Sequence, residues 1–207
     1  MKKPDSIDPL ILKAHAYIKC YLEEDDDAQG LILDDLTSVV GLDIPEGEGL
    51  SLNGLTSAVG LELPESVEWL SLDGLTSATG LILPKSIERD LYLNGLPSAV
   101  GLKLPKSLGG SLYLNGLTSA VGLKLPESVE GDLRLNGLTS AAGLELPKSV
   151  VSDLRLNGLK SAGPLLLFRY KKKFLGDFTL ILDNVSAIEA AVVLLPLVLE
   201  LRDAFLK

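Results

Sequence analysis

Residues 91–111 read LYLNGLPSAVGLKLPKSLGGS, and most of the chain copies this unit. One leucine per copy, in the Gly-Leu-Thr-Ser segment or its equivalent, aligns the copies. These leucines are Leu36, Leu55, Leu75, Leu96, Leu117, Leu138 and Leu159, so the spacing is 19, then 20, then 21 residues four times. A period of this length indicates a solenoid in which each unit is one coil. A single unit buries too little apolar surface to fold alone, so the units are expected to stack.

Each unit carries two short runs of alternating leucines. In the quoted unit these are Leu91 with Leu93, and Leu102 with Leu104. Alternation turns the leucines to one side of an extended chain, so we predict two short parallel strands per coil. Pro105 lacks an N–H and is expected to end the second strand. The Asn-Gly pair between apolar runs is also typical of a β-hairpin, which leaves a meander of hairpins as an alternative.

Two columns of small polar residues recur along the repeat. A hydroxyl or amide at an inward corner can hydrogen-bond the backbone of its own turn and of the next coil, so we expect both columns to stabilise the stack. Rows of ligand-binding residues on an exposed face are the alternative. The serine column is Ser38, Ser57, Ser77, Ser98, Ser119, Ser140 and Ser161, and the amide column is Asn53, Asp73, Asn94, Asn115, Asn136 and Asn157.

The run Leu-x-Leu-Pro-x-Ser-Val occurs at residues 61–67, 123–129 and 144–150, each time followed seven or eight residues later by Gly-Leu-Thr-Ser or its variant. This pattern resembles the bacterial leucine-rich repeats whose consensus contains Ile-Pro-x-Ser-Val. The coils here are shorter by a residue or two and lack the Ala-Phe or Cys of that family. The resemblance covers residues 31–163 and implies a protein-interaction scaffold without enzymatic activity, often at a cell surface or host interface.

The fold class predicted is therefore a mainly β repeat solenoid, with leucine-rich-repeat-like parallel coils of about 21 residues and α-helical caps at both ends. Residues 1–30 are expected to form an N-terminal capping helix, over about residues 9–23, and an acidic connection. Residues 31–163 are the seven-coil solenoid. Residues 164–207 are expected to form a C-terminal cap with one more strand near residues 177–183 and an apolar helix, for which a dimer contact is the alternative.

The two ends of the sequence also bear on where in the cell the protein is expected to be. The first residues are charged and precede no uninterrupted apolar segment, so a secretory signal is not predicted and the default location is cytoplasmic. Secretion or surface display by a non-classical route remains open. Pro196 interrupts the apolar stretch near the C-terminus, which is shorter than the roughly 20 residues that a membrane span needs.

Charge and composition limit the kinds of partner that the protein is expected to bind. The formal net charge of −9 and the low aromatic content argue against nucleic acid. Residues 20–84 contain 14 acidic and no basic residues, whereas residues 85–173 contain 13 basic and 7 acidic ones. In a solenoid this order becomes a polarity along the axis, which fits head-to-tail association or simple solvation. The single Cys20 excludes an internal disulfide, and Cys20 with the single His15 cannot form a metal site without ligands from elsewhere.

The candidate binding residues lie between the first pair of leucines in each coil, where the coils differ. This outward column reads Ser51, Ser71, Tyr92, Tyr113, Arg134 and Arg155. Tyrosine and arginine are enriched at interface hot spots, so we predict that Tyr92, Tyr113, Arg134 and Arg155 bind a protein. Ordinary exposed strand residues are the alternative. Counted from the preceding proline, Trp69 takes the place of Gly110 or Gly131, and it is either a further anchor or a ring packed on a neighbouring coil.

The sequence predicts no enzyme, no cofactor and no metal centre, because it lacks a Ser/His/Asp set, a phosphate-binding glycine motif and clustered metal ligands. The leading prediction is a scaffold that binds a protein partner of unknown identity. A self-assembling structural module, and hence a homo-oligomer, is the alternative that the charge polarity and the apolar C-terminus favour. Ice binding is a further alternative, based on the column Thr37, Thr56, Thr76, Thr118 and Thr139.

Overall fold

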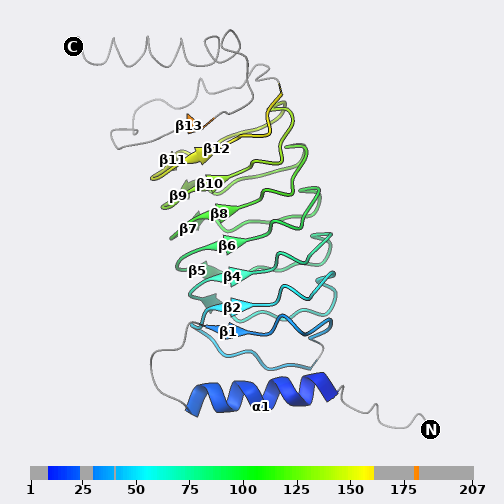
Figure 1. Ribbon diagram of the computed structural model, residues 1–207. Coiled ribbons are helices and arrows are strands. Elements are labelled where there is room, and N and C mark those ends of the chain that lie inside the picture. The colour runs from blue at the N-terminus through cyan, green and yellow to red at the C-terminus, as the bar shows by residue number, and fades with distance from the viewer. Residues whose placement is uncertain (1–8, 24–29, 40, 161–179, 182–207) are drawn as a thin grey trace, which may run out of the picture.

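The computed structural model describes residues 9–23, 30–39, 41–160 and 180–181. Within this part the chain winds as a series of coils stacked along one axis (Figure 1). All strand pairs are parallel and join equivalent residues of successive coils, such as Leu91 with Leu112 and Leu112 with Leu133. The predicted β-solenoid is confirmed, and the alternative of antiparallel hairpins is wrong.

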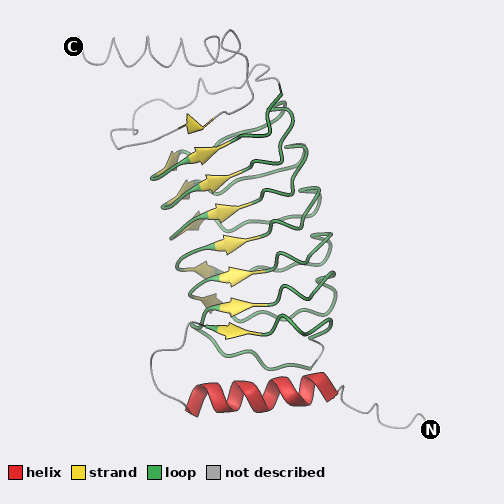
Figure 2. Ribbon diagram, in the orientation of Figure 1, coloured by secondary structure: helices red, strands yellow, loops and turns green. Residues whose placement is uncertain are grey.

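One face of the solenoid is an eight-stranded parallel sheet, drawn as the front arrows of Figure 2. Each strand is short because only the beginning of the first Leu-x-Leu run pairs with the neighbouring coils in strand geometry. In spatial order the strands are β1 (Leu31–Ile32), β2 (Leu50–Ser51), β4 (Leu70–Ser71), β6 (Leu91–Tyr92), β8 (Leu112–Tyr113), β10 (Leu133–Arg134), β12 (Leu154–Arg155) and β13 (Leu180–Ile181).

In the five coils that have a second strand, this strand lies after the proline, not before it as predicted. The Leu-x-Leu-Pro segments form no ladder, because the first leucine already donates its N–H across a turn, as Leu102 does to Ala99 O (3.0 Å), and proline has no N–H. Beyond the proline, backbone bonds between coils resume. These strands form two small sheets and are β3 (Ser66–Val67), β5 (Ser86–Ile87), β7 (Ser107–Leu108), β9 (Ser128–Val129) and β11 (Ser149–Val150).

The interior is a continuous column of aliphatic side chains. Leu91, Leu93 and Leu96 of one coil are fully buried, and so are the equivalent residues of the coils that follow. The predicted inward direction of the leucines is therefore correct for both runs, since Leu102 is also buried while Lys103 beside it is exposed. Each leucine is covered by its counterparts above and below, which supplies the burial that one unit lacks.

Glycine is required where successive coils approach most closely. A Cβ on Gly74 would lie 1.9 Å from the carbonyl oxygen of Asn53 in the preceding coil, and Gly95 meets Asp73 in the same way at 2.0 Å. The Gly of the Val-Gly turn serves a different purpose, because Gly122 has a φ of +79° with no atom near its missing Cβ. In this chain the glycine of the Asn-Gly pair therefore marks the place where successive coils come into contact, and not a hairpin turn.

The amide column forms the expected ladder between coils. Asp73 Oδ1 accepts the backbone N–H of Asn94 (2.7 Å), and Asn94 Oδ1 accepts that of Asn115 (3.0 Å), so each side chain satisfies the next turn. The serine column differs from the prediction. Its described side chains are exposed, and five of them accept the N–H of the residue two positions later, as Ser98 Oγ does from Val100 (3.3 Å); the five are Ser57, Ser77, Ser98, Ser119 and Ser140.

Helix α1 (Pro9–Glu23) lies against the first coil, beside β1 (Figure 1). Ile11, Ala14 and Ile18 are buried in the same apolar cluster as the solenoid leucines, and His15 Nε2 accepts the N–H of Asp43 (3.3 Å). Strand β13 lies within the predicted strand at residues 177–183, while the predicted C-terminal helix lies outside the described residues. No helix among the described residues has the length and apolar character needed to cross a membrane.

Candidate functional site

The eight-stranded sheet brings the four predicted binding residues into one line. The strand register aligns Ser71 with Tyr92, Tyr92 with Tyr113, Tyr113 with Arg134 and Arg134 with Arg155. All four predicted residues are half-buried and lie on the outer side of the sheet. The outward column predicted from the repeat is therefore a real surface feature.

Within the outward column the side chains stack on one another. The rings of Tyr92 and Tyr113 lie 4.4 Å apart between centroids and 11° from parallel. The guanidinium of Arg134 lies over the other face of Tyr113, 4.9 Å from its centroid. Parallel strands make this stacking possible, because equivalent side chains in neighbouring coils are separated by roughly the 4.8 Å strand spacing. The three side chains form a rigid surface of planar groups.

A column of carboxylates two residues earlier in the chain supports the stack. Asp90 accepts a bond from the Tyr92 hydroxyl (3.0 Å), and Asp132 accepts two from the Arg134 guanidinium (2.8 and 3.1 Å). Asp153 pairs with Arg155 in the same way (2.8 Å). The other oxygens of Asp90 and Asp132 bond the next coil, because Asp90 Oδ1 accepts the N–H of Ser111 (2.7 Å) and Asp132 Oδ1 that of Asp153 (3.1 Å). These pairs of side chains could have been predicted from the sequence, since residues two apart in a strand share a face.

The surroundings of Tyr92, Asp132 and Arg134 keep each of these three groups in one protonation state. Burial, followed by the hydrogen bond to Asp90, raises the pKa of the Tyr92 phenol well above its ordinary value, so the phenol stays a neutral donor. Burial opposes ionisation of Asp132, but the bonds from Arg134 and from the Asp153 amide outweigh it and hold its pKa below the ordinary value. The bond to Asp132 likewise raises the pKa of Arg134.

Trp69 occupies a different column from the one that the sequence count predicted. Because Leu70 pairs with Leu91, Trp69 lies in register with Asp90, and its coil is one residue shorter between the proline and the strand. The indole packs over the preceding coils, where a Cβ on Gly49 would lie 2.0 Å from its Nε1 and one on Gly30 2.5 Å from its Cζ2. The indole therefore packs on neighbouring coils, and its role as a binding anchor stays a prediction.

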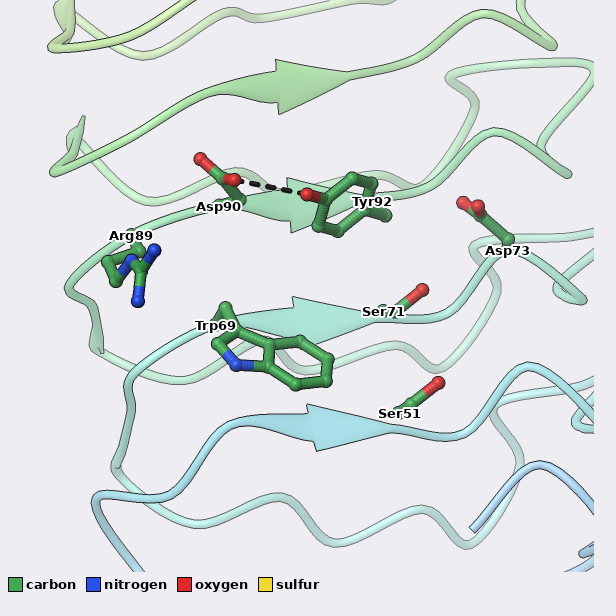
Figure 3. Close-up of a pocket in the computed structure, with 7 residues that line it drawn as sticks. All are labelled: Ser51, Trp69, Ser71, Asp73, Arg89, Asp90 and Tyr92. Carbon is green, nitrogen blue, oxygen red and sulfur yellow. Dashed lines mark hydrogen bonds between the residues drawn. The ribbon is translucent and has the colours of Figure 1, made fainter. Parts of the chain in front are cut away.

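An open pocket of about 450 Å³ lies beside Trp69 on this face. Figure 3 shows the indole and the Tyr92 ring on the same side of the sheet, with the Ser51 and Ser71 hydroxyls beside them. The two serines are almost fully buried, and their hydroxyls donate to Asp34 (2.6 Å) and Asn53 (2.8 Å). The pocket is lined by Ser51, Trp69, Ser71, Asp73, Arg89, Asp90 and Tyr92.

The described residues hold no cluster of three or more His, Cys, Asp or Glu side chains that could bind a metal ion. No protein-family model matches the chain, and neither a curated protein nor a solved structure is significantly similar to it. The chemistry of this surface therefore rests on its own geometry. This surface offers a ligand planar rings to stack on, and fixed guanidinium groups and carboxylates for hydrogen bonds and charge. It is therefore suited to binding another molecule.

Proposed function

We propose that the protein is a non-enzymatic scaffold that binds another protein through the outward column of the eight-stranded sheet. The observation that carries this proposal is the stack of Tyr92, Tyr113 and Arg134, which is half-exposed and held by Asp90 and Asp132. Tyrosine and arginine supply most of the binding energy at many interfaces. Side chains that are already fixed lose little entropy on binding, which favours affinity.

The test compares the whole protein with a variant in which Tyr92, Tyr113, Arg134 and Arg155 are replaced by alanine. Both are used to capture partners from lysate and from host-cell extract, and the affinity of each captured partner is then measured with purified components. We expect the partner to lose at least about 100-fold in affinity, since hot-spot truncations each cost about 2 kcal/mol or more. Unchanged affinity of the quadruple variant would contradict the proposal.

A matched control variant carries alanine at four exposed residues of another column, between the second pair of leucines. It changes as many exposed side chains without touching the sheet face, so it is expected to keep the partner. Circular dichroism and thermal unfolding of both variants would verify that the solenoid is intact. The control residues are Glu62, Lys103, Lys124 and Glu145.

A self-assembling module is the second candidate, because the charges are distributed unevenly along the axis. Residues 31–84 of the solenoid contain acidic side chains and no basic ones, whereas all nine basic residues of the solenoid lie between Lys85 and Lys160. An acidic and a basic end on separate molecules attract one another. The molar mass by light scattering should then rise with protein concentration and return to the monomer value in high salt; a constant monomer mass would dismiss self-assembly.

Three further expectations from the sequence stay predictions: the likeness to bacterial leucine-rich repeats, the cytoplasmic location and the ice-binding alternative. For ice binding, the hydroxyls of Thr76, Thr118 and Thr139 donate to carbonyl oxygens of the preceding coil (3.1 to 3.4 Å). The threonine column thus takes part in coil stacking. Thermal hysteresis in a freezing assay would be the direct test.

A further inference from the structure

The stack of planar side chains ends abruptly at β4. Tyr113 covers one face of the Tyr92 ring, and Arg134 covers the far face of Tyr113. On the other side of Tyr92 the register places Ser71, whose short side chain is buried and cannot reach over the ring. The pocket lies there, so one aromatic face of Tyr92 borders open space where the outward column of later coils would place a planar group.

Trp69 forms the opposite wall of this pocket. Its indole is seated on Gly49 and Gly30, which fixes the ring against the preceding coils. Figure 3 shows the indole and the Tyr92 phenol on the same side of the sheet, separated by the level of Ser71. Two aromatic surfaces on either side of one gap suit a flat or cationic group that contacts both.

The charge around the pocket is negative. The carboxylates of Asp73 and Asp90 line it, and its preceding coils carry acidic residues without any lysine or arginine. Arg89 also lines it, but the Arg89 guanidinium is bonded to Glu68 (2.9 Å). Asp73 and Asp90 each accept bonds from the protein, yet a carboxylate has about four acceptor sites and can accept more. The pocket therefore favours a cation that donates hydrogen bonds.

The other end of the stack shows which cation fits. There the guanidinium of Arg134 lies flat over Tyr113 while it donates two bonds to Asp132. At the pocket, the exposed face of Tyr92 and the carboxylates of Asp73 and Asp90 offer the same two kinds of contact without an arginine from this chain. An ammonium group is compact and strongly hydrated, so it would use the flat face of the ring less well than a guanidinium.

We propose that this pocket binds the guanidinium of an arginine side chain from the partner protein, stacked on Tyr92 beside Trp69 and paired with Asp90, while the carboxylate of Asp73 adds negative charge at the other end of the pocket. The inference rests on the proposed function in taking the arginine from a protein partner. The partner surface is then basic at this point, and the partner presents a guanidinium to the acidic half of the solenoid.

The chain contains a single tryptophan, so the indole N–H of Trp69 gives one assignable NMR signal at the pocket wall. The protein is titrated with Nα-acetyl-arginine amide, Nα-acetyl-lysine amide and Nα-acetyl-citrulline amide, the last being the neutral isostere of arginine. We expect a saturable shift with the arginine compound, weaker binding of the lysine compound, and binding at least about tenfold weaker for citrulline. Equal responses to arginine and citrulline would overturn the proposal.

Two variants locate the binding. Asp73→Asn introduces the residue that the equivalent positions Asn53 and Asn94 already carry, so it keeps the ladder and removes one charge; arginine binding should weaken severalfold. Ser71→Arg places a guanidinium at the column position that holds Arg134 and Arg155, and it should abolish the titration by filling the pocket. Glu145→Gln, which also removes one negative charge but lies far from the pocket and outside the sheet face, is the matched control and should bind as the unchanged protein does.

The outcomes separate this inference from the proposed function. Arginine binding that survives both Asp73→Asn and Ser71→Arg would refute the pocket, even if the quadruple alanine variant had lost its partner. A titration that behaves as expected, with a partner that is indifferent to the quadruple variant, would refute the proposed function and leave the guanidinium site standing.

Discussion

The outer face of the eight-stranded sheet differs between its two halves, although the backbone does not. Over β6, β8 and β10 the outward column carries Tyr92, Tyr113 and Arg134, which rest on one another. Over β2 and β4 the same positions carry Ser51 and Ser71, whose hydroxyls bond to Asp34 and Asn53 of the preceding coil. Both halves share one ladder of parallel pairs. The backbone pairing of the coils is therefore the same in both halves, while the side chains of the outward column differ.

The largest effect is expected where the shared ladder is broken. Gly74→Ala would place a Cβ 1.9 Å from the Asn53 carbonyl oxygen, and only a shift between coils could relieve that contact. The free energy of unfolding should fall by about 3 kcal/mol or more, measured by urea denaturation. Gly122→Ala is the control, because its cost comes from the φ of +79° alone and is about 1–2 kcal/mol. Equal losses for the two variants would argue against close coil contact at Gly74.

A smaller effect is expected from the stack itself, which only the later coils possess. A double-mutant cycle with Arg134→Met and Tyr113→Leu should give a coupling energy of about 0.5–1 kcal/mol in thermal or urea unfolding, because the guanidinium lies 4.9 Å from the ring centroid. The same cycle with Arg134→Met and Lys124→Met should be additive, since Lys124 lies outside the outward column. Additivity in both cycles would mean that the contact between Arg134 and Tyr113 does not stabilise the folded protein.

The smallest effect concerns the pH dependence of stability in the same half. The pKa of Asp132 is lowered in the folded protein, so its contribution is present above the unfolded value of about 3.9 and is lost as the pH falls through the folded value. Between about pH 6 and pH 2 the unchanged protein should lose more in Tm than Asp132→Asn does. Parallel Tm curves for the two proteins would mean that the bonds from Arg134 do not favour the ionised carboxylate.

Sequence reasoning succeeded where a feature repeats with the period of the chain. The leucine positions, the coil lengths and the outward column followed from counting residues, and the register of β4 to β12 agrees with that count. Sequence reasoning failed for the position of the second strand and for the column of Trp69. The second strand lies after the proline because the Leu102 amide closes a turn, and Trp69 lies beside Asp90 because its coil is one residue shorter.

The carboxylates of the candidate site are an intermediate case. Asp90, Asp132 and Asp153 each precede a tyrosine or arginine of the outward column by two residues, a spacing that puts both side chains on one face of a strand. The pairs could have been predicted from that spacing alone. The pocket could not, because it is made by what is absent over Ser71 and by the direction that the Trp69 indole takes over Gly49.

By itself the sequence determined that this protein is a stack of similar coils with an aliphatic interior, because a unit of about 21 residues can bury its leucines only against its own copies. It also determined which residues share a column. Only the tertiary structure decided which of them touch: the 4.4 Å ring stack, the carboxylates that hold it and the open face of Tyr92 arise from contacts between coils. Such contacts depend on backbone pairing and side-chain direction, which a linear pattern does not contain.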